Sequence, residues 1–333
     1  MAKGDGISRR GVMAAAGGMA AGAALTRAGP AVAATGAAPV APPLPPLPVV
    51  WGQARSIPLW PKGAPGSGFT RQPAEPGDTI YIRNVAAPDL RVFRPRESNG
   101  RALLSIPGGA YRLVSIVNEG VDVAARMTAK GYTVFVLTYR LPGEGWADRA
   151  DVPLQDAQRA MRVIRSVAGE YGFDPAQVSV VGFSAGGHLA ASLATGFAEP
   201  LAPGVDAIDR LDARPATAAL IYPVISHAAG IGHALSTQLL LGDAPGAALV
   251  ERRSPALHVT AQTPPTFLVH SLDDPAVPPE NSRIMMRALE AAKRPVEAHF
   301  FQEGGHGYGT GDPALPAHYW PDLLAAWIAR QPR

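Results

Sequence analysis

Short apolar runs alternate with stretches of helical periodicity along the chain from about residue 79 onward. The apolar runs have the length and the β-branched and aromatic content of strands. The later runs are apolar at nearly every position, which is typical of strands that are covered on both faces. The predicted strands span residues 79–84, 90–93, 102–106, 133–138, 178–182, 218–222, 266–270 and 296–301.

Helical patterns separate most of these predicted strands. Strands that alternate with helices indicate crossover connections and a mainly parallel sheet. The first two strands are joined by too few residues for a crossover, so we expect them to form an antiparallel hairpin at the sheet edge. The sequence therefore predicts an α/β fold of about eight mostly parallel strands with helices on both faces. The predicted helices span residues 119–130, 154–171, 185–195, 279–293 and 319–329.

The first 33 residues have the pattern of an export signal. The pair Arg9-Arg10 precedes a weakly apolar run, residues 11–25, and the segment ends in Ala31-Val32-Ala33. A charged start, an apolar middle and a small-residue exit form a cleavable signal, and the arginine pair resembles a twin-arginine signal. The alternative is a disordered cytoplasmic tail. Because the apolar run is too short and too mild to span a membrane, we expect no stable membrane insertion of the mature chain.

The rest of the chain is expected to comprise an extension and one large domain. Residues 34–78 are rich in proline, and the stretch 38–48 is dense enough in it to be extended. The folded core is expected to begin near residue 79, so the domain spans residues 79–333. A length of 333 residues leaves room for one such domain.

Composition and charge exclude several classes of function. The chain has no cysteine, which excludes disulfides, thiolate metal sites and a cysteine nucleophile. The formal net charge is +3, but residues 1–33 hold four basic residues and one acidic residue. The remainder therefore carries 26 basic and 26 acidic residues and is neutral. A neutral body does not favour nucleic acid as a partner.

A candidate nucleophile stands between a predicted strand and a predicted helix. Residues 182–186 read Gly-Phe-Ser-Ala-Gly, with the serine at position 184. In such a strand-to-helix turn the serine hydroxyl is raised above the sheet, beside the helix N-terminus, and the flanking glycines leave room for the strained turn. The alternative is an ordinary glycine-rich turn with an idle serine. The flanking strand and helix favour Ser184 as a nucleophile.

This turn and its neighbours resemble a known family. Pro-Gly-Gly-Ala-Tyr at 107–111 follows the third strand, Tyr-Pro-Val-Ile-Ser at 222–226 ends a later strand, and Val277-Pro278 opens a late helix. Together these motifs resemble the α/β hydrolases, in the branch of bacterial carbohydrate acetylesterases and feruloyl-esterase-like enzymes, many of which are labelled acetylxylan esterases. The resemblance covers roughly residues 79–330. It implies an α/β-hydrolase fold and a serine esterase.

The same resemblance implies an oxyanion loop. Lipase-like relatives carry His-Gly-Gly-Gly after the third strand, and a backbone N–H of this loop binds the oxyanion. Here Pro107 replaces the histidine and Ala110 stands in place of the last glycine. Because the donor is backbone, we expect Gly109 or Ala110 to supply it, paired with the N–H of Ala185. Tyr111 either borders the pocket or packs in the interior.

The family order Ser, Asp, His implies the other two catalytic residues. The pattern His-x-x-x-Asp-x-x-Val-Pro fits His270 and Asp274, so we expect Asp274 to be the acid, with Asp273 as the alternative that caps a turn. His306 lies between glycines after the last strand and is the expected base. The rival, His188, follows Ser184 by four residues on the same helix, one turn below the nucleophile, so we expect it to be structural.

The expected activity is hydrolysis of short-chain, acetyl esters on hemicellulose-derived carbohydrate such as acetylxylan. The expected partner is a small-molecule or oligosaccharide ester, with no nucleic acid. The sequence predicts no cofactor and no metal, since no two histidines have the spacing of a zinc site; it assigns no oligomeric state. Alternatives are a feruloyl or general carboxylesterase, a serine peptidase of the prolyl-oligopeptidase kind, and a non-catalytic binding protein on the same fold. The peptidases of that kind normally add a propeller, for which this chain is too short.

The export signal predicts a mature enzyme without residues 1–33 that is periplasmic or secreted. Changing Arg9→Lys and Arg10→Lys together should hold the precursor in the cytoplasm, because the twin-arginine route reads both guanidinium groups. Cell fractionation and the intact mass of the exported protein measure this, with Arg27→Lys as the matched control outside the pair. Unchanged export of the double variant would exclude that route.

Overall fold

The computed structural model describes residues 47–75, 79–202 and 204–332, which all fall in the unit Pro43–Arg333. The export signal predicted for residues 1–33 and most of the proline-dense stretch 38–48 lie outside the described residues. In the described part of the chain, no helix combines the length and the apolar character that crossing a membrane requires.

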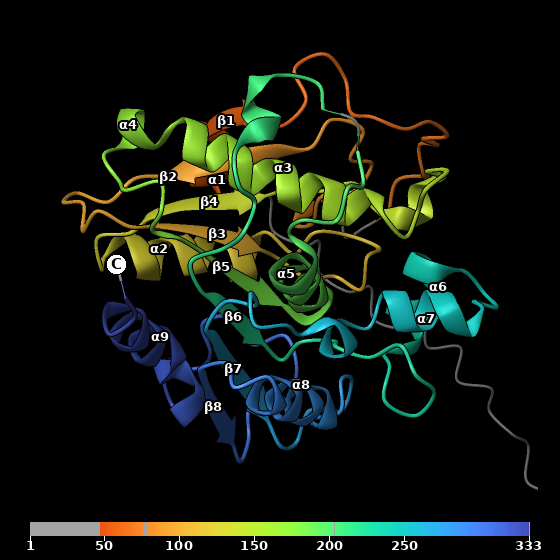
Figure 1. The fold of residues 1–333 in the computed structure, drawn as a ribbon. Helices are drawn as coiled ribbons and strands as arrows, with labels where there is room; N and C mark the ends of the chain where they lie inside the picture. Colours follow the sequence, from red (N-terminus) through yellow and green to blue (C-terminus); the bar gives the residue numbers. More distant parts are fainter. Residues whose placement is uncertain (1–46, 76–78, 203, 333) are drawn as a thin grey trace, which may run out of the picture. The chain divides into compact units, whose positions relative to one another are not determined.

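An eight-stranded sheet forms the centre of the fold (Figure 1), in the order β1-β2-β4-β3-β5-β6-β7-β8. Strand β2 runs antiparallel to both of its neighbours, and the remaining pairings are parallel. The predicted fold class is therefore confirmed. The strands are β1 (Arg55–Pro58), β2 (Asp89–Phe93), β3 (Ala102–Ile106), β4 (Thr133–Leu137), β5 (Val178–Phe183), β6 (Ala218–Ile221), β7 (Thr266–Ser271) and β8 (Val296–Phe301).

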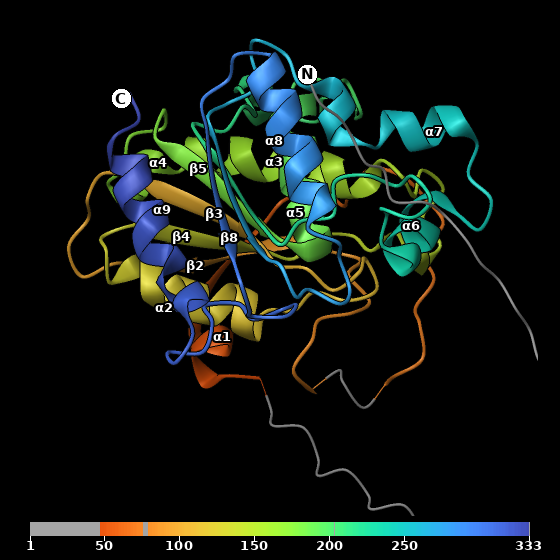
Figure 2. The same ribbon diagram turned by 90° about the horizontal axis from the view of Figure 1, so that it is seen from below.

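Helices cover both faces of this sheet. Figure 2 shows α2 and α9 on one side and α3, α5 and α8 on the other. Each of the five predicted helices is present, although the second is divided into α3 and α4. The helices are α1 (Val49–Gln53), α2 (Asp122–Thr128), α3 (Val152–Ser166), α4 (Ala168–Tyr171), α5 (Ser184–Gly196), α6 (Ala234–Leu241), α7 (Ala247–Arg252), α8 (Glu280–Ala291) and α9 (Trp320–Ala329), with a π-helical turn, η2, at Val117–Val121.

The burial of the strands explains why the sequence pattern was informative. All residues of β3, β4, β5, β6 and β7 are buried, including small residues such as Ala102 and Ala218. A parallel strand covered by helices on both faces needs apolar side chains at every position. Helix α5 is buried from Ser184 to Ala194 because it lies between the sheet and α3. The sheet therefore presents the first residue of α5 at the carboxyl end of β5.

The antiparallel edge is formed by different residues from those predicted. Residues 79–84 are not a strand, and of them only Ile82 pairs, in an isolated bridge with Val114. The edge strand is β1, in which Arg55 lies opposite Val92 of β2. The alternation of residues 79–84 has the period of a strand, but the segment meets the loop that follows β3 and does not reach the sheet edge.

The folded body begins before residue 79. Trp51, Leu59 and Trp60 are buried in the hydrophobic core. The indole N–H of Trp60 donates to Asp156 at 2.7 Å, and the same carboxylate is paired with Arg140, with both side chains fully buried. Part of the proline-rich extension is therefore built into the domain. This segment was missed because the contacts that bury it, such as that of Trp60 with Asp156, are with residues far along the chain.

Candidate active site

Ser184 occupies the junction between β5 and α5. It has a φ of 52°, in the left-handed region that residues with a side chain rarely adopt. Such a conformation costs on the order of 1–3 kcal/mol and persists only where the surroundings impose it. The carbonyl of Ser184 accepts a hydrogen bond from the N–H of Val224, in the turn after β6, at 3.1 Å. The turn places the hydroxyl at the N-terminus of α5.

Glycine is required on both sides of this serine. A Cβ at Gly182 would lie 2.3 Å from the carbonyl oxygen of Gly186, and one at Gly186 would lie 2.2 Å from that of Ile106. Both separations are far below any contact that real Cβ atoms make. The glycines therefore let the start of α5 pack directly on the ends of β5 and β3. This is the close backbone approach that the sequence motif predicts.

His306 lies in the loop after β8 and links two other predicted residues. Its Nε2 is 2.9 Å from Oγ of Ser184, and its Nδ1 is 2.7 Å from Oδ2 of Asp274. An ionised carboxylate can only accept, so Nδ1 carries the proton and donates to Asp274. Nε2 is then the acceptor for the serine hydroxyl. The structure brings Ser184, His306 and Asp274 into one hydrogen-bonded line.

The carboxylate of Asp274 is fully buried and held from several sides. Its Oδ1 accepts the N–H groups of Ala276 at 2.9 Å and Val277 at 2.8 Å. Nε2 of His270 lies 3.3 Å from Oδ2. Burial alone would raise the pKa of Asp274, but the bonds from His270, His306 and Val277 outweigh it and hold the pKa well below its usual value. Asp274 is therefore ionised at neutral pH.

Asp273 contacts the backbone of the loop that carries His306, just before the histidine. Its carboxylate accepts the N–H of Gly305 at 2.9 Å and that of Gly304 at 3.4 Å. It does not meet His306 through its side chain but caps the turn that leads to it. Of the two neighbouring aspartates, Asp274 therefore contacts the imidazole of His306, and Asp273 caps the turn before it.

The predicted oxyanion loop has three consecutive residues with positive φ. Gly109 has a φ of 126°, Ala110 of 54° and Tyr111 of 62°. The N–H of Gly108 donates to Glu119 at 2.7 Å and is already used. Among the described residues, the N–H groups of Gly109 and Ala110 have no protein acceptor, and neither has that of Ala185 in the first turn of α5. These are the groups expected to bind an oxyanion.

Tyr111 does not border the cleft, which corrects the expectation that it lines a pocket. Its side chain is buried at 1% exposure, and its hydroxyl donates to Nδ1 of His188 at 2.7 Å. The left-handed backbone at Tyr111 turns the ring inward, beneath the loop.

His188 in turn donates from Nε2 to the carbonyl of Arg253 at 2.7 Å, and burial lowers its pKa to about 4. It is therefore neutral at neutral pH, and its side chain hydrogen-bonds to Tyr111 and to the carbonyl of Arg253 instead of to Ser184 or His306.

A cleft of about 370 Å³ opens beside Ser184 and His306. Its walls come from the oxyanion loop, the His306 loop and the segment around the start of α6. His233, from that segment, lines the cleft and was not singled out from the sequence as a site residue. The other residues that line it are Tyr81, Gly109, Ala110, Arg112, Leu113, Ser115, Asn118, Glu119, Leu235, Ala276 and Gly307.

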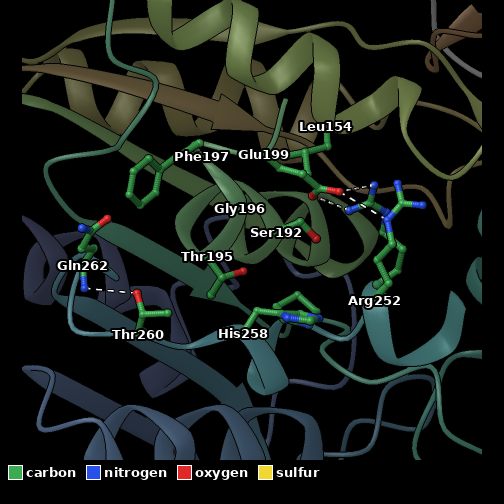
Figure 3. A pocket seen from close by; sticks show the side chains of 13 residues that line it. Leu154, Ser192, Thr195, Gly196, Phe197, Glu199, Arg252, His258, Thr260 and Gln262 are labelled. Atoms are coloured by element: carbon green, nitrogen blue, oxygen red, sulfur yellow. Dashed lines mark hydrogen bonds and ion pairs between the residues drawn. The ribbon is translucent and has the colours of Figure 1, made fainter. Parts of the chain in front are cut away.

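A second cavity, of about 390 Å³, lies at the opposite end of α5 (Figure 3). Ser192, Thr195 and Phe197 contribute to its wall, and the ion pair between Arg252 and Glu199 crosses its rim. It contains neither Ser184 nor His306.

In the described residues, no group of three or more histidines and carboxylates lies close enough to hold a metal ion.

Two family models match different parts of the chain. The BD-FAE model matches residues 89–206, which include Ser184. The prolyl oligopeptidase family model matches residues 238–331, which include Asp274 and His306.

Two curated proteins are similar to this chain. An acetylxylan esterase of Xylanibacter ruminicola is 30% identical over 237 residues, which are 70% of this chain and 46% of that protein. Endo-1,4-beta-xylanase B of Butyrivibrio fibrisolvens is 34% identical over 205 residues, which are 62% of this chain and 32% of that protein. The chain thus spans less than half the length of these two relatives.

A solved structure matches over nearly its whole length. The acetyl ester-xyloside bifunctional hydrolase from Caldicellulosiruptor lactoaceticus is 33% identical, with a TM-score of 0.70, covering 86% of this chain and 97% of that one. With the curated relatives, this likeness confirms the resemblance read from the sequence motifs. The chain belongs to the α/β-hydrolase superfamily, in the branch of acetylxylan-esterase-like enzymes.

Proposed function

We propose that the chain hydrolyses short-chain esters, above all acetyl esters of hemicellulose-derived carbohydrate such as acetylxylan, through a triad of Ser184, Asp274 and His306. One observation carries the proposal: Ser184, His306 and Asp274 form a continuous hydrogen-bonded line at the wall of a cleft. Beside that line, the N–H groups of Gly109, Ala110 and Ala185 have no acceptor among the described residues.

The reaction follows from the donors and acceptors of this line. Ser184 Oγ attacks the ester carbonyl while Nε2 of His306 takes its proton, and Asp274 stabilises the imidazolium that forms. The carbonyl oxygen becomes an oxyanion, which the N–H of Ala185 and one N–H of the Gly109-Ala110 pair stabilise. His306 then returns the proton to the leaving alcohol. Water, activated by the same imidazole, releases the acid from the acyl-enzyme.

The size and the lining of the cleft support a small acyl group and a polar alcohol. A volume of about 370 Å³ is at the lower end of the range for small-molecule sites. Arg112, Asn118 and His233 are polar residues of its lining, and polar groups of this kind can bind the hydroxyls of a sugar. The relatives named as acetylxylan esterase and as acetyl ester-xyloside hydrolase support this choice. A feruloyl ester is the alternative. Its aromatic acyl group would require a slot beside Ser184.

A second candidate activity is peptide hydrolysis. The match of the prolyl oligopeptidase family model to residues 238–331 favours it, because this region supplies both Asp274 and His306. The same triad can attack an amide carbonyl. A panel of p-nitrophenyl acetate, butyrate and octanoate, acetylated xylan, methyl ferulate and a proline-containing peptide anilide separates the candidates. We expect the acetyl esters to give the highest kcat/KM.

Export completes the proposed function. Polysaccharide esters lie outside the cell, and the signal pattern of residues 1–33 supports a periplasmic or secreted enzyme. The mature enzyme would meet its substrate there.

Ser184→Ala and His306→Ala should each abolish hydrolysis of p-nitrophenyl acetate while the fold is kept. Members of a triad act as a unit, so one loss costs nearly as much as losing all three. Steady-state kinetics with circular dichroism as the folding check measure this, and Ser192→Ala, in the same helix but outside the cleft, is the matched control. A Ser184→Ala enzyme with a tenth of the wild-type turnover would show that the nucleophile is another residue.

Asp274→Asn should lower turnover by roughly 10⁴, because the amide no longer fixes the imidazole in the required tautomer. Asp273→Asn should stay close to wild type in turnover and lose about 1 kcal/mol of stability as a weakened turn cap. The kcat values of the two variants, with their unfolding free energies, test the assignment. The reverse ranking would move the acid to Asp273, and equal mild effects would mean that neither residue is the acid.

A further inference from the structure

A π-helical turn, η2, lies between β3 and α2, next to the candidate active site. Turns of this kind are rare and are found most often at functional sites. Its central residue is Glu119, whose side chain is buried at 3% exposure. The sequence offered this glutamate only as the first residue of a predicted helix. A carboxylate buried in a core must be well supplied with donors, because its desolvation is costly.

One oxygen of Glu119 holds the oxyanion loop. Oε2 accepts the N–H of Gly108 at 2.7 Å, and at the other end of the same peptide group the carbonyl of Pro107 accepts the hydroxyl of Tyr139 at 2.9 Å. The peptide plane between Pro107 and Gly108, one residue before the N–H of Gly109, is therefore fixed from both sides. A Cβ at Gly108 would lie 2.9 Å from the Cβ of Ser184 and 3.1 Å from Oε2 of Glu119. The loop is thus clamped between the serine and the glutamate.

The other oxygen holds the loop of the general base. Oε1 of Glu119 accepts the hydroxyl of Tyr222 at 2.8 Å, and the oxygen of that hydroxyl accepts the N–H of Gly309 at 2.9 Å. Gly309 follows His306 by three residues in the same loop. The ring of Tyr222 also packs edge-on against His306, with ring centroids 5.0 Å apart. One carboxylate therefore connects both loops that the proposed mechanism needs.

The residue before Glu119 makes a contact of the same kind. Nδ2 of Asn118 donates to the carbonyl of Gly307 at 2.8 Å. A Cβ at Gly309 would lie 2.5 Å from the carbonyl oxygen of Asn118, so the base loop passes directly over the π-turn. The turn thus fixes the loop of His306 at two points.

A second buried glutamate provides a natural comparison. Glu144 is buried at 2% exposure and accepts the backbone N–H groups of Asn84 and Val85. Burial raises the pKa of Glu119 and of Glu144 alike, against hydrogen bonds that lower it. Glu144, however, touches neither catalytic loop and does not line the cleft. Both residues are buried carboxylates that accept hydrogen bonds, but only Glu119 binds groups that lead to the oxyanion loop and the His306 loop.

We propose that Glu119 is a positioning residue, which sets the oxyanion loop and the His306 loop relative to Ser184; this rests on the triad proposed above. Its hydrogen bonds, and not its charge, carry the effect. A glutamine at this position keeps an oxygen that accepts the N–H of Gly108 and gains an amide that donates to the hydroxyl oxygen of Tyr222. Alanine keeps neither contact.

The test compares Glu119→Ala, Glu119→Gln and Tyr222→Phe with the matched control Glu144→Ala, using p-nitrophenyl acetate. Glu119→Ala should lower kcat by about 10²-fold with little change in KM, the loss expected when an oxyanion donor is misplaced. Glu119→Gln should stay within about tenfold of wild type. Tyr222→Phe, which removes the hydroxyl that joins Glu119 to Gly309 but keeps the bond from Gly108 to Glu119, should fall between them. Glu144→Ala should lower the melting temperature and leave kcat unchanged.

Each other outcome has a definite meaning. A folded Glu119→Ala enzyme with wild-type kcat would overturn the positioning role. An equal loss in Glu119→Ala and Glu119→Gln would assign the effect to charge and overturn it as well. If Glu119→Ala does not fold, Tyr222→Phe decides, and a wild-type kcat in that variant would contradict the proposal. A wild-type enzyme without esterase activity would instead overturn the proposed function, and this inference with it.

Discussion

The left-handed backbone of Ser184 is the constraint around which the rest of this structure is arranged. A residue with a side chain adopts that conformation only where its neighbours leave no alternative. Here β5 ends at Phe183 and α5 begins at the next residue, Ser184. The start of α5 packs against the end of β3 through Gly186. The fully buried central strands make this junction rigid. The strain is the cost of raising one hydroxyl beside a helix N-terminus, where backbone N–H groups converge.

The two residues that hydrogen-bond in line with this serine come from distant parts of the chain. His306 and Asp274 stand on the loops after β8 and β7, and both loops are fixed by backbone N–H groups given to carboxylates. Asp274, Asp273 and Glu119 all accept such bonds. Asp274 and Glu119 are buried, and a buried polar group is favourable only when its hydrogen bonds are satisfied; Asp273 is exposed. The fold therefore supplies rigid strands, and three carboxylates supply the loop geometry.

The sequence predicted what depends on local pattern and missed what depends on distant contact. Buried parallel strands are apolar throughout, so seven of the eight predicted strands match the structure to within one residue at each end. The edge strand Arg55–Pro58 was missed, because it is short, largely exposed and defined only by its pairing with β2. The glycines around Ser184 and His306 carry a local signal. Glu119 carries none, because its role arises from contacts with Gly108 and Tyr222, which lie far from each other in the chain.

Identifying the nucleophile itself tests the assignment of Ser184 most directly. The purified enzyme would be treated with a fluorophosphonate, which forms a stable adduct with an activated serine, and the modified peptide would be located by mass spectrometry. We expect one adduct per chain, on Ser184, and no adduct when the enzyme is denatured before treatment, because the free serine is not activated. An adduct on any other residue, or a native enzyme that does not react, would contradict that assignment.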